Sequence, residues 1–172
     1  MVVDLIDPVF GELGDMVGNF FTRKNVVFCG SEQTIEIYIN YEDEPVVSQL
    51  QRDAFEKLMQ GWDEIQHKVA AAILHYYNHG EKFSYGPEDE VEKKQWWPDI
   101  ENEEDLVKYC HLSSIQIQPE DCIEDQRDMG FLNPIYLLFD RDWGGDDSDA
   151  NGVCAFVADG EVVEIGYNDI AF

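Results

Sequence analysis

The sequence predicts a single α+β domain over residues 1–172. It is expected to hold an antiparallel β-sheet, one long helix and a short helix packed on one face, and a C-terminal β-hairpin. Strand-like segments fill the first forty residues, a long helical stripe follows, and strand-like segments return near the end. Strands and helices separated along the chain are typical of helices on one face of an antiparallel sheet. With 172 residues, 44% of them hydrophobic, the chain can bury one sizeable core.

Alternating polarity predicts the N-terminal strands. Residues 9–13 form a short candidate strand, and residues 20–29 contain two apolar clusters. In residues 34–40 three isoleucines alternate with polar side chains, which is the pattern of a half-buried strand. Gly30 and Ser31 have turn chemistry, so we expect a hairpin between the last two strands.

A long helix is predicted to begin after Ser48 and to end near Gly80. Ser48 and Gln51 have the spacing of a capping box. Gly61 interrupts the pattern and marks a bend or a close approach, and Gly80 is expected to end the helix in the left-handed conformation. The apolar stripe that packs on the sheet consists of Leu50, Ala54, Leu58, Ile65, Val69, Ile73 and Tyr76.

The second half of the chain alternates acidic segments with apolar ones. Polar, acidic composition predicts loops over residues 81–100 and 120–130, with a short helix over 103–109 between them. Strands are predicted near residues 112–117 and 135–139, and the second is a continuous apolar run expected near the centre of the sheet. Asp159-Gly160 separates two further strand-like segments and is typical of a type I′ hairpin turn.

The net charge predicts which class of partner the chain binds. The chain has 11 Lys and Arg against 37 Asp and Glu, a formal charge of −26. Such a surface repels phosphates and anionic lipids, so we expect a basic protein partner rather than nucleic acid or membrane. The longest apolar run, residues 69–74, is too short to span a bilayer.

The N-terminus and the cysteines predict a cytoplasmic protein. No basic residue precedes the first apolar residues, as a secretory signal would require. The four cysteines share no CxxC spacing, and reduced thiols are the expectation for a cytoplasmic chain. They are Cys29, Cys110, Cys122 and Cys154.

An aspartate-rich segment between two predicted strands is the first candidate site. Its members, with one tryptophan among them, are Asp140, Asp142, Trp143, Asp146, Asp147 and Asp149. One interpretation is a loop that faces a basic partner, and another is a solvated acidic loop. A third is calcium binding, because Asp147, Asp149 and Asn151 match the start of a calcium loop, although Ala158 stands where the bidentate glutamate belongs.

Tryptophans and histidines supply further candidates. Trp96 and Trp97 lie in an acidic segment bounded by a proline, a composition typical of protein-binding hot spots. The alternative is that both rings fold back over the edge of the core. His75 and His79 are four residues apart on one helical face, which suits zinc but fits a helix C-terminus better.

Several short segments occur in an order that suggests a family. They are residues 9–13, Tyr76-Tyr77, residues 135–139, Asp142-Trp143, Asn151-Gly152-Val153 and residues 159–166. Together they resemble a family of small bacterial domains of unknown function. Some of its members are encoded beside toxins of interbacterial competition and are regarded as immunity proteins. The resemblance carries over no catalytic residue, because Asn151-Gly152 stands where the family usually has His-Gly.

These observations favour a binding protein over an enzyme. The sequence has no GxSxG motif and no phosphate-binding glycine loop. We expect an acidic, immunity-type inhibitor that neutralises a basic partner such as a toxin nuclease domain, without a cofactor. One alternative is a calcium-binding or calcium-stabilised domain through residues 147–152. Another is an acidic globular protein whose charge serves solubility alone.

Overall fold

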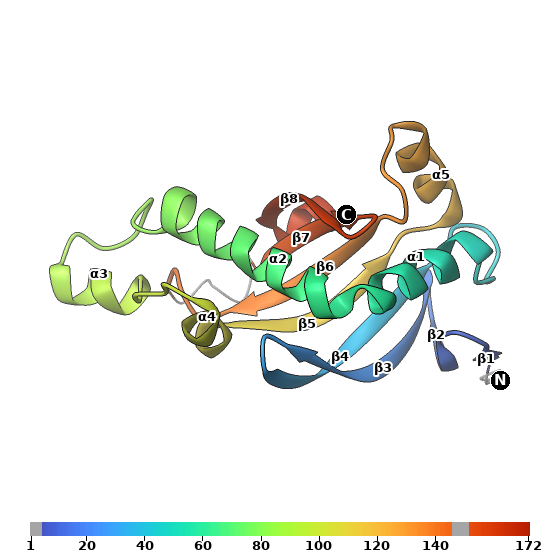
Figure 1. The fold of residues 1–172 in the computed structure, drawn as a ribbon, viewed down its shortest axis with the longest axis horizontal. Coiled ribbons are helices and arrows are strands. Elements are labelled where there is room, and N and C mark those ends of the chain that lie inside the picture. Colours follow the sequence, from blue (N-terminus) through green and yellow to red (C-terminus); the bar gives the residue numbers. More distant parts are fainter. Residues whose placement is uncertain (1–4, 146–151) are drawn as a thin grey trace.

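The computed structural model describes residues 5–145 and 152–172, and its strands form one sheet. The sheet has eight strands arranged in the order of the chain (Figure 1). They are β1 (Leu5–Asp7), β2 (Gly11–Met16), β3 (Asn19–Phe28), β4 (Ser31–Asn40), β5 (Cys110–Ile117), β6 (Ile135–Arg141), β7 (Val153–Ala158) and β8 (Glu161–Tyr167).

One strand pair departs from the antiparallel expectation. β4 and β5 run parallel, with Ile37 opposite Ile115, and the other neighbouring pairs of the described sheet are antiparallel. Parallel neighbours need a long crossover connection, usually helical. Residues 41–109 make this crossover and contain most of the helices, so the helical segment returns the chain to the starting end of β4.

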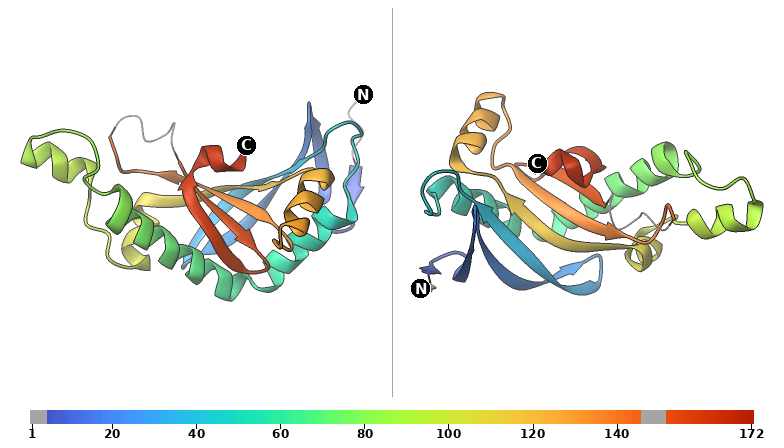
Figure 2. Two further views of the ribbon diagram at one scale, coloured as in Figure 1. Left: turned by 90° about the horizontal axis from the view of Figure 1, so that it is seen from above. Right: turned by 180° about the vertical axis from the view of Figure 1, so that it is seen from behind.

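The helices and helical turns cover both faces of the sheet. In Figures 1 and 2, α1 and α2 lie along one face, and the C-terminal turn η3 lies on the other. Short helices at either end of the molecule complete the fold. The helical elements are α1 (Gln49–Gln60), α2 (Trp62–Tyr76), the π-helical turn η1 (Tyr77–Glu81), α3 (Glu90–Trp96), α4 (Glu103–Tyr109), α5 (Glu120–Asp128) and the 3₁₀ turn η3 (Asn168–Ala171).

The main core lies between the sheet and α1–α2. The alternating isoleucines of β4 are buried there, as their spacing predicted. β6 is buried on both faces, because Leu137 and Phe139 contact the main core while Tyr136 and Leu138 belong to a second cluster with Ala171. A strand covered on both sides has no polar face, which explains the continuous apolar run.

The prediction of one long helix is wrong, because Gly61 divides it. Gly61 has φ −97° and ψ 5° and joins α1 to α2. A Cβ there would lie 2.9 Å from Ile65 Cδ1, so a side chain at this position would require Ile65 to shift. Immediately after the break, the indole Nε1 of Trp62 donates to the carbonyl of Val27 at 2.8 Å. The break therefore lets α2 begin in contact with β3.

The predicted conformation of Gly80 and two predicted loops are also wrong. Gly80 does not take a left-handed conformation; the chain continues through η1, which ends at the buried Glu81. The supposed loops contain α3 and α5. α3 buries none of its residues and α5 buries only Ile123, so neither has an apolar stripe. Both begin with acidic residues, which stabilise a helix N-terminus.

The local turn and capping predictions are confirmed. Ser48 Oγ accepts from Gln51 N–H at 3.2 Å and Gln51 Oε1 accepts from Ser48 N–H at 2.9 Å. Asp159 and Gly160 both have positive φ, as a type I′ turn requires. The first hairpin turns at Cys29 and Gly30, one residue earlier than Gly30-Ser31.

The sequence also predicts reduced cysteines and no membrane-spanning segment. All four cysteines are free. Within residues 5–145 and 152–172, the helices lack the length and apolar character needed to cross a bilayer.

A glycine pair tests the turn geometry. Gly160→Ala is expected to lower the free energy of unfolding by about 1–2 kcal/mol, because its φ of +82° is costly for an L-residue. Gly80→Ala is the control, since no atom lies within 4 Å of its Cβ position and alanine favours a helical turn. Chemical denaturation measures both, and an equal loss in the two variants would contradict the turn assignment.

Candidate functional site

The structure brings the tryptophan segment and the aspartate segment together at one end of the molecule. Gly144 N–H donates to the carbonyl of Trp96 at 2.8 Å. A Cβ on Gly145 would lie 2.5 Å from the ring of Trp96, so this half-buried ring rests directly on the backbone after β6. The described end of the aspartate segment, residues 140–145, therefore lies against the tryptophan segment although the two are far apart in sequence.

Trp97 and Trp143 hold this end together from inside. Both are 1% exposed. Trp97 Nε1 donates to the carbonyl of Tyr85 at 3.1 Å, and Trp143 Nε1 donates to Glu81 Oε2 at 3.1 Å. Tyr77 contacts both rings, at centroid separations of 6.2 and 4.7 Å. In this structure neither tryptophan offers its ring to a partner, contrary to the expectation of exposed anchors.

The aspartates are only partly within the described residues. Asp140 and Asp142 are exposed, and Asp142 Oδ2 lies 3.3 Å from His111 Nε2. Asp142 N–H donates to the carbonyl of Tyr109 at 2.7 Å, which fixes the backbone there. The remaining expected residues of the partner and calcium sites, Asp146, Asp147, Asp149 and Asn151, lie outside the described residues. The calcium site therefore stays a prediction.

A buried ion pair lies beneath this surface. Arg141 at the end of β6 pairs with Glu81 at the end of η1, and their side chains are 1% and 3% exposed. The guanidinium carbon lies 6.0 Å from the ring centroid of Trp143 and 5.3 Å from that of Tyr167. Burial lowers the pKa of Arg141, but an arginine stays cationic in a protein. The pair thus neutralises two charges within an aromatic shell.

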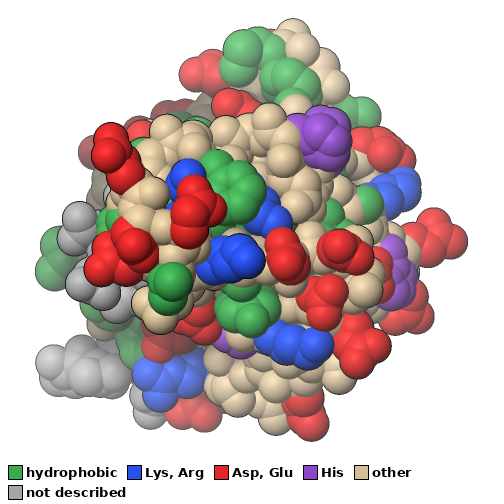
Figure 3. All heavy atoms as spheres, turned by 90° about the vertical axis from the view of Figure 1, so that its left-hand side faces the viewer, with side chains coloured by type: hydrophobic (Ala, Val, Ile, Leu, Met, Phe, Trp, Pro, Cys, Tyr) green, Lys and Arg blue, Asp and Glu red, His purple; other side chains and the backbone are tan. Residues whose placement is uncertain are grey.

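Basic side chains lie among the acidic ones at this end of the molecule (Figure 3). Lysine–carboxylate pairs join residues of its helices and loops. The pairs are Lys82 with Asp99 at 2.8 Å, Lys93 with Glu90 at 3.5 Å and Lys108 with Asp105 at 3.1 Å. Part of the negative charge here is therefore compensated within the chain.

His75 and His79 take the helix-terminal arrangement. Their rings stack with centroids 4.3 Å apart. His79 Nδ1 lies 3.2 Å from the carbonyl oxygen of His75, so this nitrogen donates a hydrogen bond to the end of the helix. That bond satisfies one of the last carbonyls of the helix, as the helix-terminal interpretation expects.

An acidic cleft lies at the other end of the sheet. It has a volume of about 380 Å³ and lies between the β4–α1 connection and the start of α5. None of the described residues that line it is a lysine or arginine. The lining residues are Asn40, Tyr41, Glu42, Asp43, Glu44, Val46, Ser48, Gln51, Pro119, Glu120 and Asp121.

The two walls of the acidic cleft are tied by Gln51. This side chain is 1% exposed, and its Nε2 donates to the carbonyls of Asn40 at 2.7 Å and Gln118 at 3.0 Å. These carbonyls belong to the end of β4 and to the residue after β5. The capping box of Ser48 and Gln51 then anchors the same glutamine to the start of α1. The cleft is therefore part of the rigid frame of the domain.

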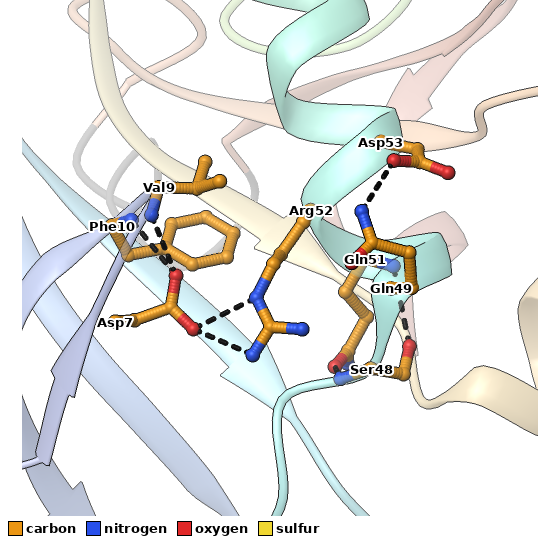
Figure 4. Close-up of polar contacts among 8 residues, drawn as sticks. All are labelled: Asp7, Val9, Phe10, Ser48, Gln49, Gln51, Arg52 and Asp53. Carbon is orange, nitrogen blue, oxygen red and sulfur yellow. Dashed lines mark hydrogen bonds and ion pairs between the residues drawn. The ribbon is translucent and has the colours of Figure 1, made fainter.

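Arg52, which follows Gln51 on α1, is already engaged in an ion pair (Figure 4). Arg52 Nε and Nη2 lie 2.9 and 2.8 Å from Asp7 Oδ2. The other oxygen of Asp7 accepts the N–H groups of Val9 and Phe10 at 2.9 and 3.1 Å. Arg52 therefore joins α1 to β1 and leaves the cleft carboxylates without its charge.

The pKa of the Cys122 thiol is affected by carboxylates of both walls. Burial raises its pKa, and the negative charges of Glu42, Asp125 and Asp121 raise it further, in that order. Glu42 belongs to one wall, whereas Asp121 and Asp125 belong to α5. The negative field of the two walls therefore overlaps at this position.

Fold and surface define a class: an α+β domain with one sheet, strongly acidic, with a cleft lined by carboxylates. The chain belongs to a family described as a domain of unknown function, DUF6985, whose model matches residues 9–172. This agrees with the expected likeness to a domain of unknown function. No curated protein and no solved structure matches the chain.

The buried ion pair makes a testable contribution to stability. Arg141→Met is expected to lower the free energy of unfolding by about 3–5 kcal/mol, because it leaves the Glu81 carboxylate buried without its partner. Adding Glu81→Gln should recover much of this loss, since the amide oxygen still accepts from Trp143. Denaturation of both single variants and the double variant measures the coupling. Additive losses would contradict it.

Acid should weaken the contact of Asp7. Burial alone raises the pKa of Asp7, but the hydrogen bonds from Arg52, Val9 and Phe10 together lower it below its ordinary value. The stabilisation is therefore present above the unfolded pKa and is lost as pH falls through the folded pKa. Asp7→Asn should cost about 2 kcal/mol at neutral pH. The difference from the native chain should shrink below about pH 4. A constant difference across this pH range would contradict this.

Proposed function

We propose that this chain is an acidic binding protein that holds a basic segment of a protein partner in the acidic cleft. The supporting observation is the composition of the cleft, where carboxylates from both walls meet and the described lining residues include neither lysine nor arginine. The other end of the molecule differs, because lysines there already pair with carboxylates. This difference favours the cleft over the aspartate and tryptophan segments as the centre of the interface.

Electrostatics explains how such a site would select its partner. Like charges that face each other across a cleft repel, and a lysine or arginine placed between them reverses the sign of the interaction. Complementary charge also speeds encounter, with association rate constants up to ~10⁸–10⁹ M⁻¹s⁻¹ at low salt. Val46, 61% exposed at the cleft, adds apolar contact area. The cleft thus combines attraction at long range with contact at short range.

An immunity-type role is the specific form of this proposal. A nuclease presents a positively charged channel to its substrate phosphates, and an acidic protein can occupy that channel in competition with the substrate. Rapid capture suits an inhibitor that must act before the toxin does. The partner would then be a basic toxin domain, and the inhibitor would need no cofactor.

Neutralising one wall of the cleft tests the site. The triple variant Glu42→Gln/Asp43→Asn/Glu44→Gln should bind an oligo-arginine peptide at least ~10-fold more weakly than the native chain at low ionic strength, because three attractive charges are lost. The matched control, Glu88→Gln/Glu92→Gln/Glu101→Gln, removes three exposed carboxylates from the opposite end. Fluorescence anisotropy with a labelled peptide measures all three proteins.

Equal weakening by the two triple variants would contradict the cleft as the site, because only net charge would then matter. The immunity-type role is tested separately, with the protein encoded beside this chain in its genome. If that neighbour has a basic domain, native chain should inhibit its activity and the cleft variant should not. Inhibition that survives in the cleft variant would place the interface elsewhere.

A further inference from the structure

Three potential metal ligands from separate elements meet beside the first hairpin. Cys29 is in the β3–β4 turn, His67 is on α2 and Glu103 begins α4. One ligand atom from each lies within 4.8 Å of the other two. His67 Nδ1 is 2.8 and 2.9 Å from the two carboxylate oxygens of Glu103, and 4.0 Å from Cys29 Sγ. The same imidazole nitrogen thus faces both other ligands.

The backbone around these residues holds them in place. Cys29 has φ 46°, and its N–H donates to Gln66 Oε1 at 2.8 Å. Gln66 precedes His67 on α2, so one helix positions both the turn and the imidazole. Asn102 caps α4 by accepting from Asp105 N–H at 2.9 Å, which fixes the helix that begins with Glu103. Each ligand therefore comes from a backbone position with its own hydrogen bonds.

The distances between the ligand atoms are close to those around a small divalent ion. Zinc binds thiolate at ~2.3 Å, imidazole nitrogen at ~2.0 Å and carboxylate oxygen at ~2.0–2.2 Å, with tetrahedral geometry. Ligand atoms around such an ion are therefore separated by roughly 3.3–3.7 Å. The nitrogen–oxygen distances here are shorter than this range and the sulfur–nitrogen distance is longer. Each of these distances differs from the range by about 0.5 Å or less.

A nucleophilic role for Cys29 fits this geometry poorly. A Cys–His–carboxylate relay needs the thiol and the carboxylate on different imidazole nitrogens, whereas Cys29 and Glu103 both face Nδ1 of His67. Burial raises the pKa of Cys29, and the charge and hydrogen bonding of Glu103 raise it further. A bound cation would favour the thiolate.

We propose that Cys29, His67 and Glu103 form a zinc site with three protein ligands and a fourth position open to water or to a partner's side chain. The mixed sulfur, nitrogen and oxygen set suits Zn²⁺ better than Ca²⁺ or Mg²⁺, which prefer oxygen ligands. The side chains of His67 and Glu103 are 54% and 38% exposed, so an ion can enter from solvent. The site would link the first hairpin to α2 and α4, independently of the acidic cleft.

Cobalt provides the sharpest test, because Co²⁺ reports sulfur ligation by its absorption. The acidic surface will bind divalent ions weakly at many carboxylates, and only a thiolate ligand gives a sulfur-to-cobalt charge-transfer band. The native chain should show this band at one equivalent of Co²⁺ and lose it when Zn²⁺ is added. Cys29→Asn should abolish the band while keeping the turn, because asparagine tolerates positive φ. Cys122→Ser, the control at a partly exposed cysteine, should keep it.

The other two ligands are tested by affinity. His67→Gln and Glu103→Gln should each weaken Zn²⁺ binding, with the histidine change costing more than the ~10–100-fold typical of outer-shell residues. Zn²⁺ should raise the melting temperature of the native chain and not that of Cys29→Asn. Absence of the charge-transfer band in the native chain would overturn the proposal. So would a band that persists in Cys29→Asn, or equal Zn²⁺ affinity in the native chain and His67→Gln.

Discussion

Repulsion among 26 surplus negative charges is the constraint on which the arrangement of this surface depends. The two hydrophobic clusters on either face of the sheet hold the domain together, and the few basic side chains determine which carboxylates are neutralised. Arg141 is buried against Glu81, and Arg52 joins α1 to Asp7. Several lysines pair with carboxylates around α3 and α4. None of the described residues that line the acidic cleft near α5 is a lysine or arginine, and we propose that a cationic partner binds there.

Local chemistry made much of the fold predictable. The capping box at Ser48, the Asp159-Gly160 turn and the isoleucine alternation of β4 depend on near neighbours, and the structure confirms them. The predictions were wrong for features that depend on contacts between residues distant in the sequence. Gly61 breaks the helix so that α2 can begin against β3, and the parallel pairing of β4 with β5 follows from the crossover that only the tertiary fold reveals. The helices α3 and α5 were not predicted, because they bury almost no apolar side chain and so have no apolar periodicity.

The candidate sites were less predictable for the same reason. Sequence composition indicated the tryptophan and aspartate segments, and the structure joins them, but it buries Trp97 and Trp143 in the core. The cleft combines residues 42–44 with residues 120–121, and each segment alone resembles an ordinary acidic loop. Cys29, His67 and Glu103 likewise come from three elements. Their proximity has no local signal, because no two of them share a motif or a helical turn.

Thermal unfolding at low and high salt tests most directly where repulsion between carboxylates destabilises the domain. Repulsion across the cleft predicts that neutralising Glu42, Asp43 and Glu44 raises the melting temperature at low ionic strength, and that salt removes this gain by screening. Neutralising Glu88, Glu92 and Glu101, at the end where lysines lie nearby, should raise it less. A larger gain at that end, or a gain at the cleft that salt leaves unchanged, would contradict the account.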